Sequence, residues 1–205
     1  MCSSDLFGGT LEGSLDAQLT ATPAYRLKLD YARVDLAALT SAFATLAELF
    51  AGSASGEVAL DSSGATRGDL VASLECRGTA HITDARLQNI SLLESMREAE
   101  RRPGVSSFPA ASGVFSCGDG KIVVQQLRFT GATQDVVASG SVDFSRNVNL
   151  QLRAAPLAGG IGAPRATGDA AQLFNLTGPI RSPDLHPLKP GPPSAGEQET
   201  TEQRN

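Results

Sequence analysis

The chain has 205 residues, and 17 Lys and Arg against 22 Asp and Glu give a formal net charge of −5 at pH 7. Its basic residues are scattered, which argues against nucleic-acid binding and against electrostatic docking on anionic lipid headgroups. Twenty-one Gly and eight Phe with no Trp are typical of many short strands and turns, and about 180 residues remain for one domain once both ends are set aside.

The first six residues, 1–6, read Met-Cys-Ser-Ser-Asp-Leu and resemble the translation of a common sequencing adapter fused in frame to a coding fragment. We interpret them as an artefact outside the domain. The alternative is a genuine short polar N-terminus. If they are an artefact, the lack of a leader or membrane anchor here says nothing about location.

Two segments near the start alternate between apolar and polar residues. Residues 11–19 place Leu11, Leu15, Ala17 and Leu19 on one face, and residues 25–31 place Tyr25, Leu27, Leu29 and Tyr31 opposite Arg26, Lys28 and Asp30. A period of two predicts half-buried strands of an antiparallel sheet.

A long helix is expected over residues 35–50. Asp35 is a suitable N-cap, and Gly52 ends the helical pattern. The apolar positions recur at helical spacing and form one stripe: Leu36, Leu39, Phe43, Leu46 and Phe50. The simplest interpretation is packing of this stripe, including Phe43, against the sheet.

Three later segments read as strand, turn and strand. The first, residues 78–90, turns at Asp84-Ala85; the second, 113–129, turns at residues 118–120; the third, 136–154, turns at residues 145–147. Short alternating strands joined by turn residues predict an antiparallel meander.

A second helix is expected over residues 91–102, with Leu92, Leu93 and Met96 on its apolar side and six charged residues elsewhere. We expect a solvated helix lying across the sheet edge or a groove mouth, with a partner-binding helix as the alternative. The long helix, and not this charged one, is expected to anchor the fold.

The C-terminal part holds a glycine-rich connector, one strand and a polar tail. Residues 158–169 match no dinucleotide or phosphate-loop pattern and are read as a mobile loop. Residues 173–179 predict a strand. Residues 187–205 have almost no apolar side chain to bury, and we expect them to be disordered.

No constellation for catalysis, metal binding or cofactor binding is visible. The two histidines, His81 and His186, match no metal motif, and no nucleophile elbow occurs. Cys76 and Cys117 could pair in an oxidising compartment, but each fits equally well as a small buried hydrophobe. We favour free thiols and a protein that is not an enzyme.

The order of these segments resembles the C-terminal region of AsmA-like proteins (AsmA/TamB-related) of the Gram-negative cell envelope. The resemblance covers roughly Leu11 to Leu185, and its specificity lies in order and spacing. One departure is Asp84-Ala85, where the family usually has Asp-Gly.

The resemblance implies a mainly β fold over residues 7–186: a curved, groove-like antiparallel meander sheet with two accessory α-helices. It implies a role in outer-membrane biogenesis, binding or conducting phospholipid along an apolar groove between inner and outer membranes. The location would be the periplasm, with an inner-membrane anchor preceding this fragment, and envelope or outer-membrane proteins as further partners.

Candidate lipid-facing residues alternate with polar neighbours in an early and a late hairpin: Leu27, Leu29, Val142, Phe144, Leu150 and Leu152. The same alternation would describe the inside of any β domain. The alternative is therefore a scaffold domain whose apolar face is covered by its own helices and handles no lipid.

Overall fold

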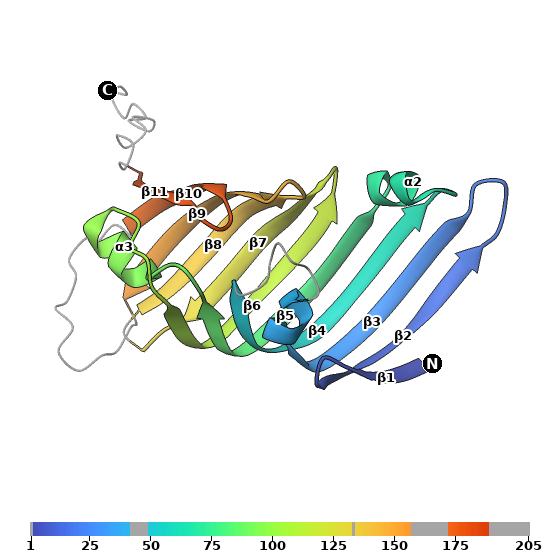
Figure 1. Ribbon diagram of the computed structural model, residues 1–205, viewed down its shortest axis with the longest axis horizontal. Coiled ribbons are helices and arrows are strands. Elements are labelled where there is room, and N and C mark those ends of the chain that lie inside the picture. Colours follow the sequence, from blue (N-terminus) through green and yellow to red (C-terminus); the bar gives the residue numbers. More distant parts are fainter. Residues whose placement is uncertain (1, 42–48, 133, 157–171, 189–205) are drawn as a thin grey trace, which may run out of the picture.

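The computed structural model describes residues 2–41, 49–132, 134–156 and 172–188, and it is dominated by one curved antiparallel sheet (Figure 1). Its eleven strands are hydrogen-bonded in sequence order, β1 to β11. Within the described residues β1 pairs with β2 alone and β11 with β10 alone, so the sheet is open. The predicted mainly β fold is confirmed.

The strands and helices have the following bounds: β1 Cys2–Leu6, β2 Gly9–Gln18, β3 Ala24–Asp35, α1 Leu36–Ser41, β4 Phe50–Ser63, α2 Arg67–Ala72, β5 Glu75–Leu87, α3 Leu92–Glu98, β6 Ser106–Gly118, β7 Lys121–Thr130, β8 Gln134–Asp143, β9 Asn147–Pro156, β10 Gln172–Pro179 and β11 Asp184–Pro187. The described residues between β3 and β6 form three helices, where two were expected.

Tight turns produce the meander in the C-terminal half. Asp119 and Gly120 join β6 to β7 with φ values of 51° and 71°. Two positive φ angles give the twist that matches antiparallel strands, and Asp-Gly tolerates them. The next turn is closed by Asp143, whose carboxylate accepts from the Asn147 amide at 2.7 Å. The two predicted hairpins 113–129 and 136–154 are therefore confirmed.

The predicted hairpin over residues 78–90 is wrong. Residues 75–87 form a single strand, β5, in which Asp84 has a φ of 52° at a register irregularity. A left-handed Asp suits a bulge as well as a turn. The segments before and after Asp84 do not pair with each other. Both pair with β4 and with β6, so β5 is one strand.

Helix α1 is shorter than expected. Asp35 is confirmed as its cap, because its Oδ1 accepts from the amides of Ala37 at 2.8 Å and Ala38 at 3.2 Å. The described part of the helix is Leu36–Ser41, and Phe50 lies in β4 instead of in the helix. Phe43 and Leu46 lie outside the described residues, as does the glycine-rich connector 158–169.

Helix α2 was not predicted. Thr66 and Asp69 form a reciprocal capping box in which each side chain accepts from the other residue's amide, at 3.2 Å and 3.1 Å. These bonds lower the pKa of Asp69. The Thr-x-x-Asp spacing was visible in the sequence, but a helix of six residues has no apolar period to detect.

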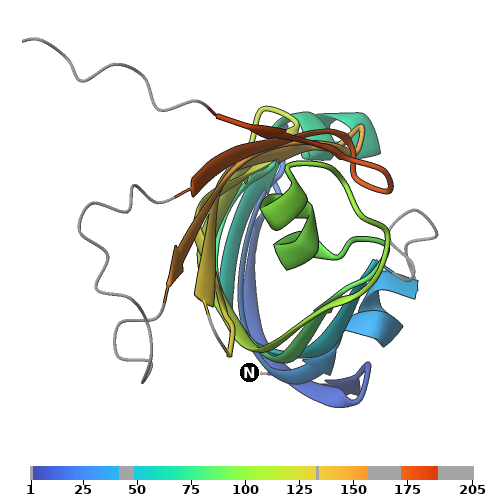
Figure 2. The ribbon, with the colours of Figure 1, turned by 90° about the vertical axis from the view of Figure 1, so that its left-hand side faces the viewer.

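Helix α3 lies inside the concave side of the sheet (Figure 2). Leu92 and Met96 are each 3% exposed and belong to one core cluster with side chains of β5 to β11. The cluster includes Phe108, Phe129, Val136, Leu152, Phe174 and Leu185. The expectation of a solvated helix is therefore wrong: the charged helix, shorter than predicted, supplies core packing.

Two buried serines fix α3 in place. The Ser106 hydroxyl donates to the Ile90 carbonyl at 2.7 Å and accepts from the Leu92 amide at 2.6 Å. The Ser95 hydroxyl donates to the Ser91 carbonyl at 2.6 Å and accepts from the Arg102 amide at 2.8 Å. Satisfied buried polar groups of this kind specify one position for the helix.

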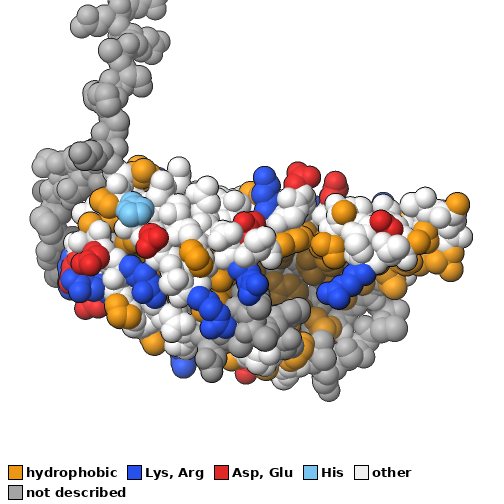
Figure 3. All heavy atoms as spheres, turned by 45° about the horizontal axis from the view of Figure 1, so that its top comes forward, with side chains coloured by type: hydrophobic (Ala, Val, Ile, Leu, Met, Phe, Trp, Pro, Cys, Tyr) orange, Lys and Arg blue, Asp and Glu red, His pale blue; other side chains and the backbone are white. Residues whose placement is uncertain are grey.

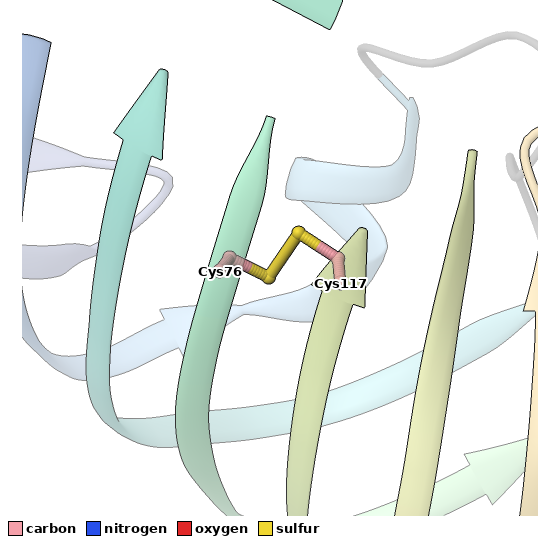
Figure 4. Close-up of a disulfide and its surroundings, with 2 residues drawn as sticks. All are labelled: Cys76 and Cys117. Carbon is pink, nitrogen blue, oxygen red and sulfur yellow. A yellow bond between two sulfur atoms is a disulfide. The ribbon is translucent and has the colours of Figure 1, made fainter. Parts of the chain in front are cut away.

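A disulfide joins Cys76 of β5 to Cys117 of β6 (Figure 4). The two residues are directly opposite in the register, with Cα atoms 4.7 Å apart. This separation is close to that of a non-hydrogen-bonded antiparallel pair, whose side chains approach most closely. The preference for free thiols is wrong.

At the two ends the sheet reaches further than expected. Cys2–Leu6 pair with β2, and their interpretation as an adapter artefact stays a prediction. Pro187 belongs to β11, and the Leu188 amide donates to Leu173 O at 2.8 Å, so the predicted tail begins too early by these residues. Residues 189–205 lie outside the described part. No helix in the described part is long and apolar enough to cross a membrane.

We expect Met96→Ala to lower the free energy of unfolding by about 2–5 kcal/mol, because it empties a fully packed core position. Glu98→Ala should cost roughly a few tenths of a kcal/mol, since Glu98 forms exposed ion pairs with Arg97 and Arg102. Urea melts measure both. Equal, small losses would show that α3 does not support the core.

Loss of the disulfide should destabilise the domain by about 2–4 kcal/mol, because the bond restrains an unfolded loop with a sequence separation of 41. Thermal melts of the Cys76→Ala/Cys117→Ala double variant and of the reduced wild-type chain should agree. If reductant leaves the wild-type midpoint unchanged, the pairing is contradicted.

Candidate functional site: the apolar concave face

The two faces of the sheet differ in polarity. Strand alternation sends Arg26, Lys28 and Asp30 of β3 to the outer face and Leu27 and Leu29 to the inner face. The outer face carries an ion pair between Arg26 Nε and Asp61 Oδ1 at 2.8 Å. This bond and the charge of Asp61 raise the pKa of Arg26.

The register aligns inner-face residues into rows that cross the sheet. One row follows Cα partners from Leu15 through Leu27, Leu60, Cys76, Cys117, Ile122 and Val142 to Val148. The next runs from Gly13 through Leu29, Val58, Gly78, Phe115, Val124, Gly140 and Leu150 to Leu176. Residues far apart in sequence thus form one continuous apolar surface.

This surface has a covered part and an open part. Under α3, Val136 is 0% and Leu152 2% exposed. Away from α3 the inward side chains are half-buried, and we call these residues the open wall: Leu27, Leu29, Tyr31, Val58, Leu60, Cys76, Phe115, Val124 and Val142. At its margin Leu15 is 63% and Ile122 38% exposed. Figure 3 shows hydrophobic side chains within a hollow on this side of the molecule.

Two glycines make room for aromatic rings on the open wall. A Cβ atom at Gly78 would stand 2.7 Å from Cζ of Phe115, and one at Gly56 would stand 2.8 Å from the Tyr31 hydroxyl oxygen. Each ring therefore reaches over a glycine of a neighbouring strand. The Tyr31 hydroxyl donates to Thr79 O at 2.8 Å, and burial raises the pKa of Tyr31.

The predicted lipid-facing residues divide into four groups, of which three lie on strands. Leu27, Leu29 and Val142 lie on the open wall, and the register places Leu27 and Val142 in the same row. Leu150 is half-buried but packs against the core cluster. Leu152 is a fully packed core residue, so its assignment to an open wall is wrong.

Phe144 was also predicted to line the face. It follows the last residue of β8, its amide donates to Gly120 O at 2.8 Å in the adjacent turn, and its side chain is 41% exposed. It therefore lies at the turn end of the sheet and not on a strand wall.

Several open-wall residues were missed. Val58 and Leu60 are two residues apart in the sequence, and Phe115 and Val124 lie in the predicted hairpin 113–129. The alternation of these residues with their neighbours could therefore have been read from the sequence. What the sequence lacked was the register that places these strands between the early and late hairpins.

The open wall ends at a polar rim. Two residues beyond the Leu27–Leu60 pair, on the same two strands, the register pairs Tyr25 with Ser62. Both border a surface depression together with Asp16, Arg26, Asp61, Ser63, Ser73 and Glu75. Ser62 Oγ donates to Leu70 O at 2.8 Å, which ties α2 to this rim.

Among the described residues no group of three or more His, Cys, Asp or Glu is placed to hold a metal ion. No protein-family model matches the chain, and no curated protein and no solved structure matches it either.

The open and covered parts should respond differently to a buried charge. Leu152→Asp should abolish cooperative unfolding, since it places a carboxylate in a packed core. Val58→Asp should lower the melting temperature far less, because its side chain is only half-buried. Circular-dichroism melts compare the two variants.

Ala59→Asp is the matched control. It is the next residue of β4, on the outer face, with Lys28 and Arg77 as its cross-strand partners, and it should leave the melt near that of the wild type. If Val58→Asp melts like Leu152→Asp, the wall is ordinary core.

Proposed function

We propose that this domain is a non-enzymatic cell-envelope protein of outer-membrane biogenesis that binds phospholipid acyl chains on its apolar concave face. The observation that carries the proposal is the open wall: an inner apolar surface that continues in register beyond the part covered by α3. Acyl chains need apolar surface without charge, which this wall provides. In a full-length protein the same face would conduct lipid between the membranes.

The separation of charged residues on the outer face from apolar residues on the inner face supports the proposal. Lys28 and Arg77 lie on the outer face, whereas their neighbours Leu29 and Cys76 lie on the wall. A chain on the concave side would contact apolar atoms while the convex side meets water. Covering half-exposed apolar surface is favourable by roughly 25 cal/mol per Å².

The disulfide supports a location in an oxidising compartment. Cross-strand disulfides persist in the periplasm and outside the cell, while cytosolic thiols are kept reduced. Cys76 belongs to the open wall, Cys117 is its cross-strand partner, and neither is a member of the core cluster. The periplasm, with an inner-membrane anchor elsewhere in the protein, is the proposed location, and envelope or outer-membrane proteins are the proposed further partners.

The alternative is a scaffold domain that handles no lipid, and α3 favours it in one respect. Leu92 and Met96 show that the C-terminal part of the face is filled by the protein's own side chains. A scaffold would require the remaining open wall to be covered as well. The two functions therefore differ in whether a lipid can reach Val58.

Photo-crosslinking tests the proposal. Vesicles of phosphatidylethanolamine and phosphatidylglycerol carrying a diazirine in the acyl chain are irradiated with wild-type chain, Val58→Asp and Ala59→Asp. We expect adducts on the wild type and Ala59→Asp, and at least a several-fold loss on Val58→Asp with its fold retained. No adduct on the wild type, or equal adducts on all three chains, would favour the scaffold.

A further inference from the structure

The disulfide lies at the end of the β5–β6 pair where no short connection joins these two strands. At their other ends they are joined through α3, which buried serines hold in place. At the disulfide end, the Ser73 hydroxyl donates to Ser63 O at 2.6 Å and so ties the chain before β5 to β4. The turn at Asp119 and Gly120 ties the end of β6 to β7. The disulfide is the covalent bond that joins β5 to β6 here.

Side-chain packing across this part of the β5–β6 pair is sparse. On the inner face the register pairs Gly78 with Phe115. The next inner pair is Ala80 with Gly113, so in both pairs a glycine contributes no side chain. Cross-strand side-chain pairs stabilise neighbouring strands, and glycine inside a strand weakens it. The corresponding inner-face pairs of β3 and β4 each join two aliphatic side chains: Leu27 with Leu60, and Leu29 with Val58.

The bond is accessible and lies outside the core. Both cysteines are half-buried, and neither is a member of the core cluster around α3. Figure 4 shows the bond bridging the two strands. Thiols attack exposed disulfides more readily than buried ones. Breaking the bond therefore leaves the packing of Val136 and Leu152, which belong to the core cluster, in place.

The open wall lies on both sides of this strand pair. Its residues up to Cys76 lie on β3 to β5, and those from Phe115 onward lie on β6 to β8. The inner-face row through both cysteines continues to Leu60 on β4 and to Ile122 on β7. If the disulfide ends of β5 and β6 part, this continuous apolar surface becomes two narrower strips. An acyl chain lying across the strands then loses contact with one of them.

We propose that the Cys76–Cys117 bond is a redox-sensitive clasp on the open wall. When a dithiol reduces it, the disulfide ends of β5 and β6 separate locally and the wall holds acyl chains less tightly, while the core around α3 stays folded. The effect on lipid rests on the proposed function, whereas the local opening does not.

The reaction is thiol–disulfide exchange. A thiolate of the dithiol attacks one of the two sulfur atoms, the S–S bond breaks, and the other cysteine leaves as a thiolate that takes up a proton. The second thiolate of the reductant then attacks the mixed disulfide and releases the first cysteine. The clasp gains two electrons and two protons, and the dithiol becomes a disulfide.

Hydrogen exchange tests the clasp without lipid. Amide exchange is measured on the oxidised chain and on the chain reduced with dithiothreitol. Because the strand ends open locally, exchange in residues 76–80 and 113–117 should accelerate at least about tenfold more than exchange in β8 and β9. A bond that only restrains the unfolded chain would accelerate all of these segments by the same factor. Equal acceleration, or none, would overturn the clasp.

The Cys76→Ala/Cys117→Ala double variant is the control. It keeps Cys2, so any response of this variant to dithiothreitol does not come from the clasp. Its exchange should match that of the reduced wild-type chain, with and without dithiothreitol. If the variant exchanges like the oxidised wild-type chain, the bond does not hold the strand ends together and the clasp is wrong.

The link to lipid is tested with vesicles of phosphatidylethanolamine and phosphatidylglycerol that carry a diazirine in the acyl chain. The oxidised wild-type chain should give several-fold more adducts than the reduced chain, and the double variant should give the reduced level in both conditions. Equal adducts on oxidised and reduced chains would overturn the control of lipid by the clasp. No adducts on the oxidised chain would count against the proposed function, and hydrogen exchange would still decide the local opening.

Discussion

The structure depends on one constraint: in the part of the chain that the structure describes, an antiparallel sheet has a single apolar face and no second sheet covers it. Register aligns inward residues of successive strands, so Leu29 and Leu150 lie in one row although more than a hundred residues separate them. An apolar surface of this kind must be covered by other elements, or the sheet must curve so that the surface packs against itself. This sheet does both, since it curves around α3 and buries Phe129, Val136 and Phe174 beneath it.

Helix α3 shows why the charged face of a helix is a poor guide to its place in the fold. Its Glu and Arg residues pair with one another on the exposed side, between Arg97 and Glu94 and between Arg102 and Glu98. The decisive contacts are a few apolar side chains and two serines, of which Ser95 is fully buried. A short helix with two apolar anchors suffices when the sheet curves around it on both sides.

Local patterns predicted the late meander and the cap at Asp35, because turn chemistry and capping depend on adjacent residues. The predictions were wrong where the structure depends on which strands pair with each other. Asp84 has a turn-like backbone but lies in a bulge, since β5 pairs with β6 on both sides of it. The Cys76–Cys117 bond likewise required the β5–β6 register, which the intervening α3 segment hides from the sequence. Leu152 and Val142 point to the same face, but only Leu152 belongs to the core cluster around α3, so one is core and the other wall.

The same apolar face thus serves stability at one end and accessibility at the other. If the open wall were further core, its inward side chains would be as buried as Val136. Instead, the described open wall is half-buried, and exposure rises toward Leu15 at the β2 edge. The disulfide falls within this less packed region, where it joins β5 to β6 at the end away from α3. A covalent link and cross-strand pairing can hold a wall in shape without filling the space in front of it, which is what a surface that receives an apolar ligand requires.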